Sequence, residues 1–167
     1  MAEIHSPSER FLIDTLNQHF SSLHERSCVL VQRAGNVIYD RSDDRDTSIW
    51  SAVGENALRS VGVVEQTCGG LLSNLWDDPF EWTLAETLST GDDVLEYLRE
   101  VEATRQRAFS RLVTDADLFK AVSLPSEQLR PLIVVILDTL VRAVEYHGRA
   151  VACLEFLTTR GHAGGII

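Results

Sequence analysis

The sequence predicts one all-α domain, built as a four-helix bundle with one long crossover connection. Apolar residues recur at intervals of three and four residues over four long segments, and capping or turn residues separate these segments. No convincing alternating strand pattern occurs, and residues 36–39 are the only short strand candidate. Because 167 residues suffice for one core, we expect a single domain over 1–160 and a Gly-rich tail over 161–167.

The first helix is expected to start at Ser6-Pro7-Ser8-Glu9 and to run to about Gln32. A serine cap, a proline at the first helical position and a glutamate that closes a capping box together form a strong start signal. Gly35-Asn36 should end the helix. Its predicted buried face consists of Ile13, Leu16, Phe20, Leu23, Ser27, Leu30 and Val31.

The second helix should follow a charged, turn-prone loop over residues 41–46, with Thr47 or Ser48 as its cap. It should close at Trp76-Asp77-Asp78-Pro79, because a proline disfavours a helical conformation of the residue before it. The predicted stripe, which is unusually polar in its middle, consists of Ile49, Ala52, Val53, Asn56, Ser60, Val63, Val64, Thr67, Cys68, Leu71, Leu72 and Leu75.

Two capping boxes, Thr83 to Glu86 and Thr90 to Asp93, predict a short turn and then a third long helix. A further capping pattern, Thr114 to Asp117, predicts one helical turn before the loop at Leu124-Pro125-Ser126. The stripe of the third helix consists of Val94, Leu95, Leu98, Val101, Arg105, Ala108, Phe109 and Leu112.

The fourth helix is expected to begin near Ser126 or Arg130, with Pro131 in its first turn, and to run to about Thr158. One face consists of Leu132, Val135, Ile136, Leu140, Ala143, His147, Ala150, Val151 and Leu154, and Leu137, Val141 and Val144 extend it around the helix. A helix with so wide an apolar surface is usually central or lies at a subunit contact, so we expect a homodimer.

Charge and composition limit the classes of partner and the cellular compartment that we expect. A formal charge of −10 argues against nucleic acid as a partner, because phosphate binding depends on Lys and Arg. No apolar run approaches the ~20 residues of a membrane span, and residues 1–10 are polar where a secretion signal would be apolar, so we expect a cytoplasmic protein with no membrane contact. Cys28, Cys68 and Cys153 are widely spaced and should be reduced core residues.

Three segments resemble the DinB-like family, whose members are metalloenzymes and include thiol-dependent transferases. Residues 51–59 (SAVGENALR) resemble its second-helix pattern, residues 95–103 (LEYLREVEA) its third helix, and residues 143–151 (AVEYHGRAV) its fourth-helix pattern. The resemblance implies an up-down-down-up bundle and a metal site of three histidines. Those positions are Arg59, Ala143 and His147 here, so only one histidine remains.

A single imidazole cannot hold zinc or nickel, and an arginine places a permanent cation where the metal ion would lie. We therefore expect no metal and no cofactor, and a remnant pocket formed by Asn56, Arg59, Ala143 and His147. Catalytic residues are not identified.

Each of these residues also has a structural interpretation. His147 is a base or donor in the pocket, or a core histidine bound to a nearby oxygen. Arg59 anchors an anionic ligand, or it pairs with Glu55 or Glu145. The small polar residues Asn56, Ser60 and Thr67 contact a ligand, or they allow close helix packing, which is the more frequent role. We expect His24 and Cys28 to be core neighbours, since two residues alone do not make a metal site.

The sequence therefore predicts a non-metal, homodimeric DinB-like protein with a small-molecule ligand. The alternative is a thiol-dependent transferase or isomerase that works without the usual metal, in which Arg59 holds an acidic substrate and His147 transfers a proton. A third possibility is an assembly factor that acts through its acidic surface. Classical motifs are absent, including G-x-S-x-G, Gly-Lys-Ser and H-E-x-x-H, and neither Glu65 nor Glu145 has the Glu-x-x-His spacing of a di-iron bundle.

Overall fold

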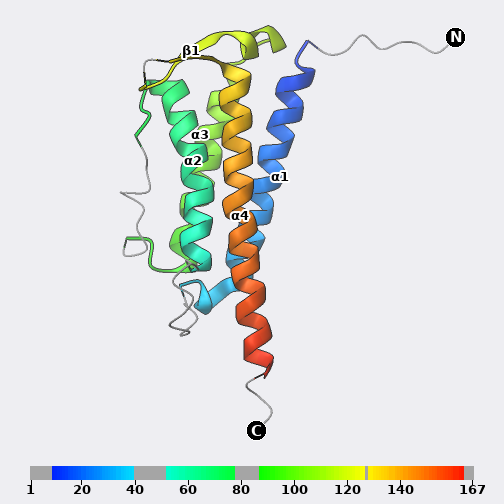
Figure 1. The fold of residues 1–167 in the computed structure, drawn as a ribbon, viewed down its shortest axis with the longest axis vertical. Coiled ribbons are helices and arrows are strands. Elements are labelled where there is room, and N and C mark those ends of the chain that lie inside the picture. The colour runs from blue at the N-terminus through cyan, green and yellow to red at the C-terminus, as the bar shows by residue number, and fades with distance from the viewer. Residues whose placement is uncertain (1–8, 40–51, 78–86, 127, 164–167) are drawn as a thin grey trace, which may run out of the picture.

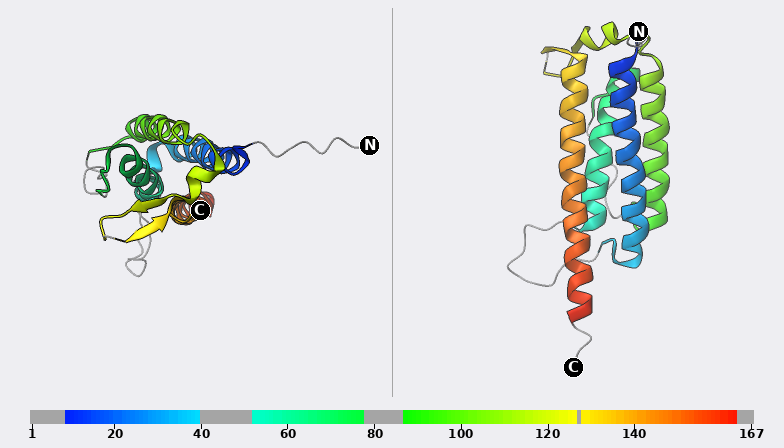
Figure 2. Two further views of the ribbon diagram at one scale, coloured as in Figure 1. Left: turned by 90° about the horizontal axis from the view of Figure 1, so that it is seen from above. Right: turned by 90° about the vertical axis from the view of Figure 1, so that its right-hand side faces the viewer.

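The structure is a computed structural model that describes residues 9–39, 52–77, 87–126 and 128–163, with the side chains of these residues up to 159. It is mostly helical, with four long helices: α1 (Phe11–Ala34), α2 (Val53–Ser73), α3 (Gly91–Ser110) and α4 (Leu132–Ala163). They lie side by side with their long axes roughly aligned (Figure 1). Seen from above, they surround a common interior, and the C-terminal part of α4 extends beyond the other helices (Figure 2).

Contacts at the two ends of the molecule define the helix directions. The Tyr39 hydroxyl, just after α1, donates to the Leu88 carbonyl, just before α3. At the opposite end, Arg111 Nη1 donates to the Leu72 carbonyl at 3.1 Å, so the C-terminal ends of α2 and α3 are neighbours. Thus α2 and α3 run in one direction, and α1 and α4 run in the other (Figure 1). The end of α2 and the start of α3 therefore lie at opposite ends of the molecule.

The predicted inner face of α1 is confirmed, since all seven of its residues are buried. The helix begins at Phe11, and the expected cap and proline, Ser6 to Ser8, lie outside the described residues. Its first N–H groups bind instead to Asp115, whose Oδ2 accepts from Leu12 N at 2.9 Å and whose Oδ1 accepts from Ile13 N at 3.0 Å. Gly35, with a φ of 48°, ends the helix as expected.

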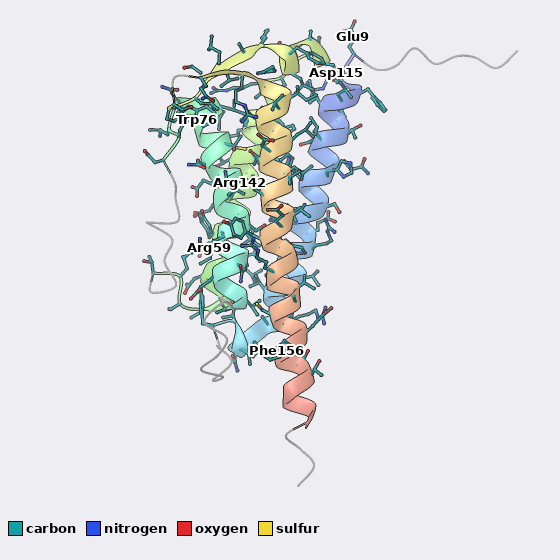
Figure 3. All side chains as sticks on the ribbon, viewed as in Figure 1. Glu9, Arg59, Trp76, Asp115, Arg142 and Phe156 are labelled. Carbon is teal, nitrogen blue, oxygen red and sulfur yellow. The ribbon has the colours of Figure 1, made fainter. Side chains whose placement is uncertain are left out.

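Helix α2 begins at Val53, and the expected cap at Thr47 or Ser48 lies outside the described residues, as does Ile49. Its polar middle is buried, as the stripe predicted. The prediction for Leu75 was wrong, because this side chain is 61% exposed and lies beyond the helix. The helix ends earlier because Asn74 adopts the left-handed conformation, with a φ of 57°. Trp76 lies at this upper end of α2 (Figure 3).

The predicted capping box of α3 is confirmed. Thr90 Oγ1 accepts from Asp93 N at 3.2 Å, and Asp93 Oδ2 accepts from Thr90 N at 3.0 Å. The helical turn expected from the pattern Thr114 to Asp117 is also present, as the 3-10 helix η3 (Asp115–Phe119). The other predicted capping box, Thr83 to Glu86, lies outside the described residues.

The sequence indicated residues 36–39 as the only strand candidate and no other strand, and both predictions were wrong. Residues 35–37 form a 3-10 helix, η1 (Gly35–Val37), whereas β1 (Ala121–Ser123) and β2 (Leu129–Pro131) form a two-stranded antiparallel sheet. Strands of three residues are too short to produce a visible alternating pattern.

Helix α4 begins at Leu132, close to the later of the two predicted starts, but Arg130 and Pro131 belong to β2 and not to the first turn of the helix. The Leu132 N–H donates to the Lys120 carbonyl at 2.9 Å and so extends the pairing of the strands into the first turn of the helix. The helix continues past Thr158 to Ala163, which includes the first three residues of the segment assigned to the tail.

All four helices contribute to one apolar core. The rings of Phe20 on α1 and Phe109 on α3 illustrate its packing, with centroids 5.7 Å apart in an edge-to-face arrangement. In the described parts of the chain, no helix combines the length and apolar character needed to cross a membrane.

Candidate functional site

The four residues of the predicted pocket lie on α2 and α4. Asn56, Ala143 and His147 are buried, with exposed fractions of 4%, 0% and 8%, and Arg59 is half-buried. Arg59 and Arg142 project from these two neighbouring helices on the face shown in Figure 3.

His147 connects α4 to α1. Its Nδ1 forms a hydrogen bond of 3.1 Å with the hydroxyl of Ser27, whose side chain is 1% exposed. Burial, together with the positive charge of Arg26, lowers the pKa of His147 below its ordinary value of 6.5. The imidazole is therefore neutral near pH 7 and bound to an oxygen in the core.

The small polar residues of α2 connect it to α4. The Ser60 hydroxyl donates to the carbonyl of Ala143 at 2.7 Å, and two turns further along α2 the hydroxyls of Thr67 and Thr139 lie 2.7 Å apart. Asn56 Nδ2 donates to the Ala52 carbonyl at 3.3 Å. These bonds satisfy buried polar atoms inside the protein, which favours the packing interpretation of the polar stripe.

The residues at the three positions that the DinB-like resemblance would assign to metal ligands do not fit a metal ion. Ala143 has no donor side chain, Arg59 carries a positive charge, and one ring nitrogen of His147 is already bound to Ser27. Among residues 9–39, 52–77, 87–126 and 128–163, no group of three or more His, Cys, Asp or Glu residues is placed to hold an ion.

A small cavity lies between α1, α2 and α3. Its volume is about 30 Å³, enough for roughly one or two water molecules. Its polar lining consists of His24, Ser27, Ser60, Glu102 and Arg105, and its apolar lining of Phe20, Leu23, Val61, Val64, Leu98 and Val101. None of the four predicted pocket residues lines it, but Ser27 and Ser60 lie between the cavity and the positions of His147 and Ala143.

One wall of the cavity is a buried ion pair. Arg105 is 1% exposed, and its Nε and Nη2 donate to the two carboxylate oxygens of Glu102 at 2.7 and 2.6 Å. Its other donors reach Asn17 Oδ1 and, at 3.0 Å, Ser21 Oγ. The guanidinium also lies 5.3 Å from the ring centroid of Phe109. The charge of this wall is therefore balanced.

Sequence reasoning placed Arg105 on a buried stripe but gave it no role. Two signals were available. Glu102 precedes it by three residues on the same helix, and Asn17 and Ser21 share one face of α1 because they are four residues apart. That these two pairs of residues face each other depends on how α1 packs against α3, which the sequence does not encode locally.

The three cysteines are free, and Cys68 and Cys153 are buried. Cys28 Sγ lies 3.6 Å from His24 Nε2, as expected for core neighbours on one helix. Burial raises the pKa of Cys68 to about 12 and raises that of Cys28 above its ordinary value, so both are thiols near pH 7.

Comparison with known proteins adds no family and no relative, since no family model, no curated protein and no solved structure matches this chain.

Proposed function

We propose that the chain is a cytoplasmic, homodimeric, DinB-like four-helix bundle protein that binds a small polar molecule in its interior cavity and uses no metal ion. The helix directions support this assignment. The order α1 down, α2 up, α3 up and α4 down is the arrangement that the family resemblance implies.

One observation carries the proposal. The three positions at which the family would bind metal are occupied by an arginine, an alanine and a histidine bound to Ser27, whereas hydroxyl groups line a cavity beside them. Interior polar groups next to empty space bind either water or a polar solute.

The chemistry of the lining indicates the class of ligand. Ser27 and Ser60 offer hydroxyl groups, His24 offers ring nitrogens, and the charges of Arg105 and Glu102 cancel each other. A neutral molecule that both donates and accepts hydrogen bonds suits this lining better than an anion or a cation. A ligand much larger than water enters only if side chains around the cavity rotate.

The test is to identify what copurifies with the protein. Purified protein is denatured, and the released small molecules are quantified by mass spectrometry. We compare the wild type with Ser60→Val, which removes a lining hydroxyl and adds bulk to the cavity, and with Ser73→Val, an exposed position on the same helix. We expect a constant molar ratio of one compound to protein for the wild type and for Ser73→Val, and little or none of this compound from Ser60→Val. Equal recovery from all three proteins, or no such compound, contradicts the proposal.

A second candidate is the thiol-dependent transferase or isomerase that works without metal. The lowered pKa of His147 favours it, because a neutral imidazole is able to accept a proton. Low-molecular-weight thiols with electrophilic acceptors provide the assay. If activity is found but is unchanged in both His147→Ala and Arg59→Ala, this assignment fails.

A further inference from the structure

The outer face of α4 carries an exposed apolar row. Leu137, Val141 and Val144 are 43%, 56% and 43% exposed, and Gly148 continues the row with open space around the position of an added Cβ. The spacing of four, three and four residues places all four on one line along the helix. This line lies opposite the core, because the buried residues Thr139, Ala143 and Ala150 lie on the other side of α4. We call these four residues the α4 row.

A row of charges borders the α4 row along one edge. Asp138, Arg142, Glu145 and Arg149 are all exposed, and their signs alternate along the helix as negative, positive, negative, positive. Reversal of the helix direction reverses this order, so a second copy running the opposite way presents the complementary charge at each position.

We propose that the α4 row is the contact by which two copies of this chain associate, with the two α4 helices antiparallel around a two-fold axis. This inference rests on the homodimer of the proposed function and identifies its interface. Such an interface is isologous, so the same surface of each protomer must complement itself.

The positions of the row meet this requirement. Rotation about an axis between Val141 and Val144 brings Val141 of one copy opposite Val144 of the other, and Leu137 opposite Gly148. A leucine facing a glycine lets the two helices approach closely while the side chain fills the space. The row is therefore complementary in size as well as apolar.

The bordering charges are also complementary to themselves, about a two-fold axis at nearly the same position along α4. In the antiparallel arrangement Asp138 faces Arg149 of the second copy, and Arg142 faces Glu145. In a parallel two-fold arrangement the charge rows of the two copies would lie on opposite sides of the contact, so these complementary pairs would not form.

Existing contacts of these charges do not prevent the pairing. Asp138 forms an ion pair with Arg130 at 2.8 Å, and the side chains remain 54% and 37% exposed. Arg149 lies 5.1 Å from the ring centroid of Tyr146. Exposed pairs of this kind are weak, so the side chains are able to turn toward a partner.

The first test is the mass of the full chain in solution by light scattering after size exclusion. The wild type should have twice the chain mass of 18.6 kDa. Val141→Asp places a charge in the centre of the row and should reduce the mass to that of one chain. Val29→Asp, at a 53% exposed valine on α1, is the matched control and should remain a dimer.

The second test exchanges charges, which perturbs folding less. Arg142→Glu should weaken the dimer at least 10-fold, and Arg142→Glu combined with Glu145→Arg should restore its dissociation constant, because each new charge again faces its opposite. A dimer that Val141→Asp and Arg142→Glu leave intact uses another surface, which overturns this inference but not the proposed homodimer. A wild-type mass of one chain overturns both, and the cavity ligand is tested independently.

Discussion

Replacement of Glu102 by glutamine tests how the protein tolerates a buried guanidinium. Arg105 is 1% exposed, and two of its nitrogens donate to the carboxylate of Glu102. Glutamine keeps the shape of the side chain but removes its negative charge and turns an N–H₂ group or a single oxygen toward the guanidinium. Asn17 and Ser21 remain as neutral partners.

The expected cost follows from the surroundings of the pair. Removal of one partner from a buried ion pair typically costs about 3–5 kcal/mol. Because the Glu102 side chain keeps 13% of its surface exposed and the guanidinium keeps other contacts, we expect the lower end, about 3 kcal/mol. For a chain of this size each kcal/mol lowers Tm by about 2–4 °C, so Tm should fall by roughly 6–12 °C.

Urea unfolding followed by circular dichroism measures this change at pH 7. Glu100→Gln, at an exposed position on the same helix, should change the free energy of unfolding by less than about 0.5 kcal/mol. The double variant Glu102→Leu with Arg105→Met should be more stable than Glu102→Gln alone, because no unpaired charge remains buried.

The pH dependence provides a second check. Burial raises the pKa of the Glu102 carboxyl. Hydrogen bonds from Arg105 and Gln106, together with the charges of Arg105 and His24, lower this pKa by a larger amount, so that it lies below the ordinary value of 4.5. A lowered pKa in the folded state contributes stability above pH 4.5, and this contribution is lost as the pH falls below that value. The gap between wild type and Glu102→Gln should therefore narrow under acid conditions. A loss below about 1 kcal/mol at pH 7, or a gap that is as large at pH 3 as at pH 7, refutes the reasoning.

Ser27→Ala should lower the free energy of unfolding by about 1–2 kcal/mol, because a buried imidazole nitrogen loses its partner. Ser110→Ala, at an exposed hydroxyl, is the control in the same urea experiment, and equal losses would contradict the expectation. Asp115→Asn should cost about 1 kcal/mol and accelerate amide hydrogen exchange in the first turn of α1, whereas unchanged exchange would exclude the capping role. At pH 8 iodoacetamide should modify half-buried Cys28 well before Cys68, because burial raises the pKa of Cys68 to about 12. Peptide mass mapping measures the order of modification, and the reverse order would contradict the packing described for Cys68.

The helical parts of the fold were predictable because their signals are local. All seven predicted core residues of α1 are buried, and the capping box that starts α3 lies within four residues of sequence. Periodicity and capping depend on neighbours one turn away, so the sequence displays them directly.

Features that join distant segments were not predictable in this way. The start of α1 is capped by Asp115, about a hundred residues away, and β1 and β2 are too short for periodicity to mark them. The helical pattern of the sequence also led to a predicted start of α4 at or before Arg130, whereas Arg130 lies in β2 and pairs with β1.

The candidate site shows the same limit. The sequence singled out His147, and separately placed Ser27 on an apolar face, but the bond between them spans 120 positions. The family resemblance directed attention to α2 and α4, whereas the cavity lies among α1, α2 and α3. Only packing of the helices reveals that Ser27 and Ser60 connect the two regions.

We infer that the positions matching the metal ligands of the DinB-like pattern serve helix packing in this protein. The most direct measurement is metal content by plasma mass spectrometry, on protein purified without chelator and then dialysed against zinc, nickel and manganese. We expect no stoichiometric ion in the wild type. One tightly held equivalent per chain that disappears in His147→Ala would contradict the claim.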